Sequence, residues 1–102
     1  QGCMTEALGV GVYDFIAEMA AADKIGWVHF RNVKGQLPRF TEVFMDEGDI
    51  DMRRAMEIYR DNGFNGPYMM DHTPKFPVGR SEWLGKAYAN GYIRALIKTV
   101  YG

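Results

Sequence analysis

The sequence predicts an α/β fold in which short parallel strands alternate with helices. Three segments carry apolar residues at the spacing of one helical face, and two short aromatic or β-branched segments lie between them. The strand candidates repeat after roughly 40 residues, from Trp27 to Tyr68, which is about the size of one βα unit in a (β/α)8 TIM barrel. A parallel sheet of the barrel type is therefore the fold that we expect.

The helical segments are recognised by apolar residues that recur every three or four positions. Asp49 or Asp51 can cap the start of the second helix, and Asn62-Gly63 supplies its C-terminal stop. The predicted buried faces are Val12, Phe15, Ile16, Met19 and Ala20 in the first helix, Met52, Ala55, Met56 and Tyr59 in the second, and Leu84, Tyr88, Gly91, Tyr92, Ala95, Leu96 and Thr99 in the third.

The strand candidates cover residues 26–30 and 66–71. The first is aromatic and β-branched, and the second opens on a turn glycine. Each is followed by a long stretch without a periodic pattern, residues 32–48 and 72–80, which we expect to be irregular. Barrel enzymes carry their active sites on the loops that follow the strands.

The composition excludes several classes of protein. The 12 Lys and Arg residues against 13 Asp and Glu give a net charge of −1, which favours neither nucleic acid nor an anionic membrane as a partner. No apolar run approaches the roughly 20 residues of a membrane span. Cys3 is the single cysteine, so an internal disulfide is excluded and a cytoplasmic location is expected.

The first residues, Gln1-Gly2-Cys3, contain no initiator methionine and no signal-peptide pattern. We interpret the chain as a fragment of a longer protein, with trimming of a tag or propeptide as the alternative. Two or three strands of a parallel barrel leave open edges and an uncovered inner face. We therefore expect the chain to pair with the missing N-terminal part or to self-associate as a homo-oligomer.

His29 lies near the end of the first predicted strand, with Trp27 and Arg31 on the same face by alternation. A neutral imidazole at this position suits Mn, Fe or Zn. A core histidine satisfied by a backbone carbonyl is the alternative.

Asp71 ends the second predicted strand, and His72 opens the loop after it. A carboxylate at the tip of a barrel strand is costly unless it binds a cation or a polar ligand. The unperturbed pKa of histidine, about 6.5, suits acid–base work. A turn-forming aspartate beside a surface histidine is the alternative, but His29 and Asp71 should point into one mouth.

The acidic segment 46–51 resembles a calcium loop only superficially, because its glycine is third and no late glutamate fits the EF-hand pattern. We interpret the segment as a loop that ends in a helix N-cap.

Several motifs together resemble the mannonate dehydratase family across nearly the whole chain. Residues 27–32 (WVHFRN) look like the family's strand with a His-Phe/Leu-Arg core, and residues 47–52 (EGDIDM) are similar to its Gly-Asp-x-Asp-Met segment. Residues 70–72 (MDH) look like the end of its Arg-Pro-Asp-His strand, and residues 89–96 (ANGYIRAL) are similar to its closing helix.

The resemblance implies a C-terminal fragment, residues 1–102, of a single TIM-barrel catalytic domain, covering about strands six to eight. It implies a divalent metal, usually Mn2+ with Fe2+ as the second choice, held by His, Cys, His and Asp. His29 and Asp71 match two of these ligands. In the favoured register the ligand Cys falls just before Gln1, and Cys3 takes a Ser/Thr position.

The implied reaction is dehydration of D-mannonate, a sugar acid, to 2-keto-3-deoxy-D-gluconate. His72 matches the family's acid–base histidine, and Arg31 could bind the substrate carboxylate. The chain departs from the family at Met69, Met70 and Met45, which replace Arg, Pro and His. The family's tyrosine has no secure match, and simple registers place Ser81 or Trp83 near it. These departures bear on whether mannonate is the substrate, and they bear less on the fold or on metal binding.

Three functions stay open at this point. The first is a metal-dependent sugar-acid dehydratase, a hydro-lyase whose isolated fragment is inactive. The second is a xylose-isomerase-like barrel isomerase or epimerase with the same metal face. The third is a non-enzymatic αβ module in which His29 and Asp71 are structural.

Overall fold

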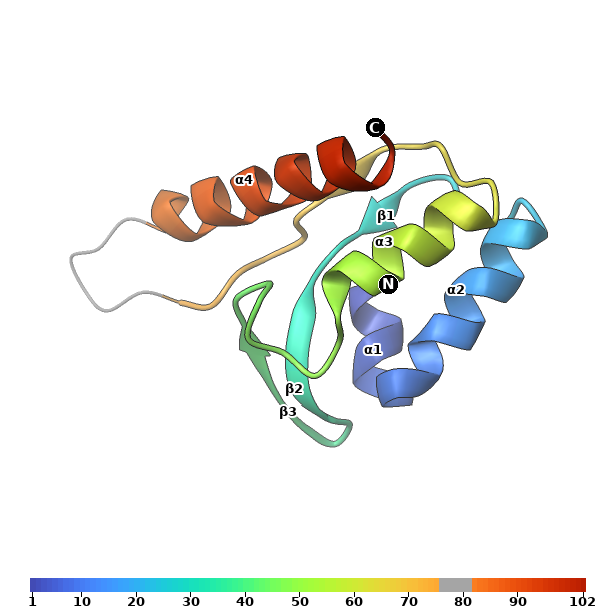
Figure 1. Cartoon of the computed structure of the whole chain (residues 1–102). Helices are drawn as coiled ribbons and strands as arrows, with labels where there is room; N and C mark the ends of the chain where they lie inside the picture. Colours follow the sequence, from blue (N-terminus) through green and yellow to red (C-terminus); the bar gives the residue numbers. More distant parts are fainter. Residues whose placement is uncertain (76–81) are drawn as a thin grey trace.

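The computed structural model describes residues 1–75 and 82–102 (Figure 1). The chain begins with α1 (Gly2–Leu8), a 3-10 turn η1 (Gly9–Gly11) and α2 (Val12–Ala21). Strand β1 (Val28–His29) leads into a hairpin of β2 (Asn32–Gln36) and β3 (Arg39–Val43). The order then continues with α3 (Met52–Asp61), β4 (Tyr68–Met69) and α4 (Trp83–Val100).

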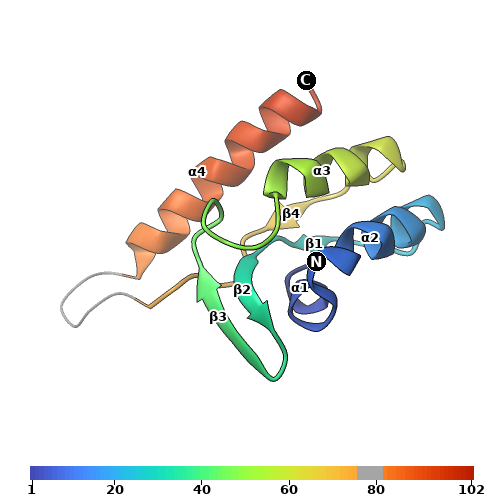
Figure 2. The same cartoon turned by 60° about the horizontal axis from the view of Figure 1, so that its bottom comes forward.

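The centre of the fold is a parallel pair of strands, β1 and β4. Val28 is paired with Tyr68 and His29 with Met69, and the Val28 amide donates to the Pro67 carbonyl at 3.0 Å. Helices α2, α3 and α4 lie side by side with α3 in the middle, over one face of this pair (Figure 2). The parallel pair confirms the expected α/β class. Membership of a larger barrel stays a prediction.

Each strand of the pair is entered through the same helix ending. After α2, the Asp23 and Lys24 amides donate to Ala20 and Met19 carbonyls at 3.0 Å each, and Asp23 has a φ of 56°. After α3, the Gly63 and Phe64 amides make the equivalent bonds, and Gly63 has a φ of 88°. Both are Schellman endings with a left-handed residue. This shared ending explains the repeat seen in the sequence and confirms Asn62-Gly63 as a helix stop.

The second helix buries the face that the sequence predicts, and the first buries most of it, with Phe15 and Met19 half-buried and Tyr13 buried in addition. Val12, Ile16 and Ala20 of α2 are buried in the core. In α3 the predicted face is buried throughout, and Asp51 caps the helix by accepting from the Arg54 amide at 3.0 Å. The acidic segment before α3 is thus a loop that ends in an N-cap, as expected.

The third predicted helix forms, but its predicted buried face is mostly wrong, although Tyr92 and Leu96 of that face pack partly buried against the core. Leu84 and Tyr88 are 55% and 43% exposed, whereas α4 buries Gly85, Ala89, Ile93 and Val100. Apolar residues occur on several sides of this helix, so periodicity alone does not select the buried face. The buried face combines the small residues Gly85 and Ala89 with Ile93 and Val100, and packing against α3 decides which face that is.

Two further elements were not anticipated. Residues 32–48, expected to be irregular, contain the β2–β3 hairpin, in which Val33 is paired with Glu42 and Leu37-Pro38 form the turn. Residues 2–8, to which no element was assigned, form α1. Within the described residues, no helix is long and apolar enough to cross a membrane.

Candidate active site

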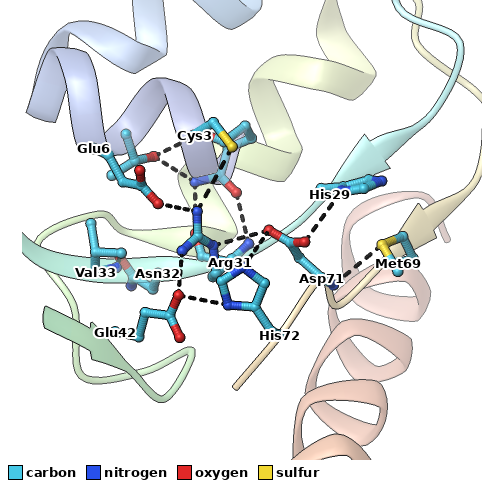
Figure 3. Close-up of polar contacts among 12 residues, drawn as sticks. Cys3, Glu6, His29, Arg31, Asn32, Val33, Glu42, Met69, Asp71 and His72 are labelled. Atoms are coloured by element: carbon cyan, nitrogen blue, oxygen red, sulfur yellow. Dashed lines mark hydrogen bonds and ion pairs between the residues drawn. The ribbon is translucent and has the colours of Figure 1, made fainter. Parts of the chain in front are cut away.

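Polar side chains gather where β1 and β4 end. Because the strands are parallel, their carboxyl ends meet at one edge, and His29, Arg31, Asp71 and His72 form a single cluster there (Figure 3). All four residues singled out in the sequence are therefore brought together. The cluster also contains Glu6 and Glu42, which the sequence analysis did not single out.

Asp71 joins the two strand ends. Its Oδ1 atom lies 3.3 Å from His29 Nδ1, and its Oδ2 atom lies 3.1 Å from Arg31 Nε. Asp71 has a φ of 61°, in the left-handed region that costs an L-residue about 1–2 kcal/mol. Strain of this kind persists where the surrounding contacts fix the residue, and functional sites are the usual place for it.

Arg31 is the buried hub of the cluster, with 3% of its side chain exposed. Its guanidinium contacts carboxylates from three elements: Glu6 of α1, Glu42 of β3 at 2.8 Å, and Asp71 after β4. Burial lowers the pKa of Arg31, but the hydrogen bond to Glu6 and the three negative charges outweigh it and raise that pKa overall. A buried cation needs such partners because leaving it unpaired is strongly unfavourable.

The start of the chain clamps Arg31 from the other side. The Gln1 side chain accepts from the Arg31 amide and donates to its carbonyl, both at 2.9 Å. A Cβ atom at Gly2 would lie 2.8 Å from Arg31 Nε, closer than real Cβ atoms come. Glycine at position 2 therefore makes room for the arginine.

His72 is the more open of the two histidines, with 53% of its side chain exposed. Its Nδ1 atom lies 2.6 Å from Glu42 Oε1, and its Nε2 atom lies 3.6 Å from Asp71 Oδ2. It borders a hollow that is also lined by Arg31, Asn32, Phe44, Met45 and Tyr88. A solvent-accessible imidazole beside two carboxylates suits proton exchange with a bound molecule.

Asn32 fixes the loop that forms one wall of this hollow. Its amide nitrogen donates to the Met45 and Ile50 carbonyls at 2.9 and 2.8 Å. A Cβ at Gly48 would lie 2.1 Å from the Asn32 side chain, so the loop closes tightly over the asparagine. The residues that depart from the family motifs are close by: Met45 is buried in the same wall, and the Met69 sulfur accepts from the Asp71 amide at 3.3 Å.

The chain offers two neighbouring donors for a metal ion. Ligands about 2.1 Å from one ion lie roughly 3.0–3.4 Å apart, and the 3.3 Å between His29 Nδ1 and Asp71 Oδ1 fits that spacing. Across residues 1–75 and 82–102, no group of three or more His, Cys, Asp or Glu side chains is arranged to hold a metal. The donor types therefore fit, but further ligands would have to come from elsewhere.

Of the three other candidates, the structure describes two. Cys3 is exposed, and its sulfur lies 3.9 Å from the Arg31 guanidinium. Trp83 opens α4 with an exposed side chain. Ser81 lies outside the described residues.

Comparisons with known proteins identify the family of the chain. The family model for D-mannonate dehydratase (UxuA) matches residues 2–100. A mannonate dehydratase of Lactococcus lactis subsp. lactis (strain IL1403) is 32% identical over 111 residues, covering 96% of this chain and 31% of the relative. One from Lactococcus lactis subsp. cremoris (strain MG1363) is 32% identical, covering 95% and 31%. The chain thus spans about a third of the length of these curated relatives. It belongs to the D-mannonate dehydratase family.

Proposed function

We propose that this chain is part of a hydro-lyase that removes water from a sugar acid, with D-mannonate as substrate and 2-keto-3-deoxy-D-gluconate as product. The observation that carries the proposal is the meeting of His29, Asp71 and His72 at the joined ends of β1 and β4, in a chain of this family. An imidazole–carboxylate pair beside an open histidine provides donors for a cation and a group for acid catalysis.

His29 and Asp71 are the residues that would hold the divalent metal, with Mn2+ as the first choice and Fe2+ as the second. When bound, such an ion supplies Lewis acidity that makes the C2 proton of the substrate easier to remove. The Arg31 contact to Asp71 Oδ2 keeps that carboxylate oriented, so Oδ1 faces His29. The other ligands belong to residues that this chain does not supply.

His72 is the proposed acid. The reaction breaks the C2–H bond, whose proton goes to a base, and the C3–O bond, whose hydroxyl takes a proton from His72 and leaves as water. The enol that remains becomes the 2-keto product. The exposure of His72 gives its ring access to a bound substrate, and its contact to Glu42 holds the ring.

Arg31 was predicted to bind the substrate carboxylate, and that prediction is untested. A guanidinium that is 3% exposed and already faces three carboxylates is poorly placed for a fourth anion. Its contacts support a different role, in which Arg31 positions Asp71 and Glu42.

We further propose that the chain acts as the C-terminal part of a barrel, about strands six to eight, and is inactive alone. Val28 and Phe30 are buried beneath the helices, whereas Trp27 on the other face of β1 is 61% exposed. The exposed side of β1, next to Trp27, leaves room for covering apolar surface. The missing barrel strands, or failing them a second copy of this chain, would provide it. A cytoplasmic location remains a prediction.

The decisive experiment is to purify the protein at its natural length and incubate it with D-mannonate and Mn2+. We expect a 2-keto-3-deoxy acid, detected by its periodate–thiobarbiturate colour, and its loss in His72→Ala but not in the surface control Glu57→Gln. A ketose or an epimer as product would instead indicate an isomerase or epimerase.

A second measurement separates an enzyme from a structural module. We expect the bound Mn2+, measured by elemental analysis, to fall in His29→Ala relative to the unchanged protein and to Glu57→Gln. Equal metal content in the three proteins would contradict the assignment of His29 as a ligand.

A further inference from the structure

We infer that Glu42 is a positioning residue for the acid step: it holds His72 through Nδ1 and so directs Nε2 toward the Asp71 carboxylate. This inference rests on the proposed function, in which His72 donates the proton to the leaving hydroxyl. Glu42 belongs to the hairpin in a stretch that the sequence analysis expected to be irregular, and no role was assigned to it there.

The geometry at His72 carries the first step. Glu42 Oε1 lies 2.6 Å from His72 Nδ1, while Asp71 Oδ2 lies 3.6 Å from His72 Nε2 (Figure 3). One ring nitrogen therefore has a close carboxylate partner, and the other faces the strand end where His29 and Asp71 meet. An imidazole that donates from Nδ1 to a carboxylate has a fixed tautomer and a fixed ring direction, with Nε2 left for the exchanging proton.

The second step is that Glu42 is itself held in place. The same Oε1 atom accepts from Arg31 Nη1 at 2.8 Å, and Arg31 is buried. Glu42 is paired across the hairpin with the fully buried Val33. The hairpin is in turn tied to α1, because the Leu37 amide donates to the Glu6 carbonyl at 2.8 Å. A carboxylate anchored in this way can orient an exposed imidazole that has little packing of its own.

The third step concerns what connects the two histidines. His29 contacts Asp71, Asp71 contacts Arg31, Arg31 contacts Glu42, and Glu42 contacts His72. The Arg31 cation lies between the Asp71 and Glu42 carboxylates, so both carboxylates share one positive partner. Arg31 thus sets the position of a metal donor on one side and of the acid on the other.

A simpler reading is that Glu42 only neutralises Arg31. Glu6 provides a matched control, because its carboxylate also contacts the Arg31 guanidinium, whereas no hydrogen bond or ion pair joins it to His72 in the described part of the chain (Figure 3). If neutralisation is the whole role of Glu42, losing either carboxylate should have the same effect on turnover. If Glu42 orients His72, its loss should lower kcat by much more.

The test compares Glu42→Ala, Glu6→Ala and His72→Ala in the protein at its natural length, with D-mannonate and Mn2+. Removing a partner that orients a working side chain costs about 10- to 100-fold. We therefore expect Glu42→Ala to lower kcat by about 10- to 100-fold with KM changed less than about threefold, and Glu6→Ala to lower it by less than about threefold. In the His72→Ala background, adding Glu42→Ala should cost less than about a further twofold.

Equal losses of kcat in Glu42→Ala and Glu6→Ala, or a full additional loss in the His72→Ala background, would overturn the inference and leave the proposed function standing. Unchanged kcat in His72→Ala would instead overturn the proposed acid. Should Glu42→Ala fail to fold, Glu42→Asp compared with Glu6→Asp decides: each variant keeps a negative charge beside Arg31 on a shorter side chain, but the first also withdraws an oxygen that contacts His72. Retention of full kcat in Glu42→Asp, or an equal loss in Glu6→Asp, would count against the inference, and a loss of about tenfold or more in Glu42→Asp alone would support it.

Discussion

The two ends of the β1–β4 pair differ in their side chains, which are charged at one end and aromatic at the other. At the carboxyl end, a buried arginine, three carboxylates and two histidines contact one another. At the amino end, the Tyr68 ring lies edge-on to Tyr59, Phe64 and Tyr101, with centroids 5.5–6.3 Å apart. The first end contains charged side chains and the left-handed residue Asp71, whereas the second end buries aromatic rings. We expect turnover to depend on the contacts of the first end, and we expect the second end to contribute to stability but not to turnover.

Arg31 provides the strongest test of this division, because it is charged yet buried. Replacing Arg31 with Met leaves three carboxylates facing one another, so we expect the free energy of unfolding to fall by about 3–5 kcal/mol. Urea unfolding followed by circular dichroism would measure the loss. A loss below about 1 kcal/mol would show that the carboxyl end contributes little to stability and would sharpen the contrast.

His72 should behave in the opposite way. The ring of His72 is exposed and its contacts are polar. His72→Ala should therefore leave the free energy of unfolding, measured in urea, within about 0.5 kcal/mol of the parent value. Loss of an acid lowers kcat by about 10²–10⁴-fold. Steady-state kinetics with mannonate, alongside the unfolding curve, would check both. A variant that lost stability in proportion to activity would contradict the division.

The strand-end residues could be predicted from the sequence, because parallel strands bring their carboxyl ends together whatever lies between them. The partners of Arg31 could not. Glu6 and Glu42 lie 25 and 11 positions away in the chain. They sit on α1 and β3, two elements that hydrophobic periodicity did not indicate. Much of the hairpin is exposed, so β3 has no regular alternation of apolar and polar residues by which a strand is recognised in a sequence.

Gly2 packs against Arg31, which in turn contacts the proposed metal ligand Asp71. The Cβ of Gly2→Ala would meet Arg31 Nε at 2.8 Å and displace the guanidinium from Asp71. Overpacking of this kind costs about 1–3 kcal/mol. We expect weaker Mn2+ binding by isothermal titration calorimetry as well, because Asp71 loses a contact. Gly91→Ala is the control, since nothing lies within 4 Å of a Cβ there.

Removing the hydroxyl of Tyr101 tests how much the amino end contributes to stability. The Tyr101 hydroxyl donates to the Phe64 carbonyl at 2.8 Å and contacts the Tyr68 hydroxyl at 2.8 Å. Tyr101→Phe keeps the ring but removes both contacts, which should cost about 1–2 kcal/mol. Thermal melting would show the loss, and kcat should be unchanged because the strand ends lie on the other side of the pair.

The smallest effect concerns alkaline pH. Burial is the main reason that the pKa values of Tyr59 and Tyr68 are raised, and contacts with Tyr101 add to it. In the unfolded chain tyrosine ionises near pH 10. Because the folded pKa values are higher, the stability these hydroxyls contribute is complete below about pH 10 and declines as the pH rises above it. Melting temperatures from pH 8 to 11.5 should therefore be level and then fall, with a shallower fall in Tyr68→Phe. An equal fall in both proteins would show that the Tyr68 hydroxyl does not cause the alkaline loss, and it would remove this part of the contrast.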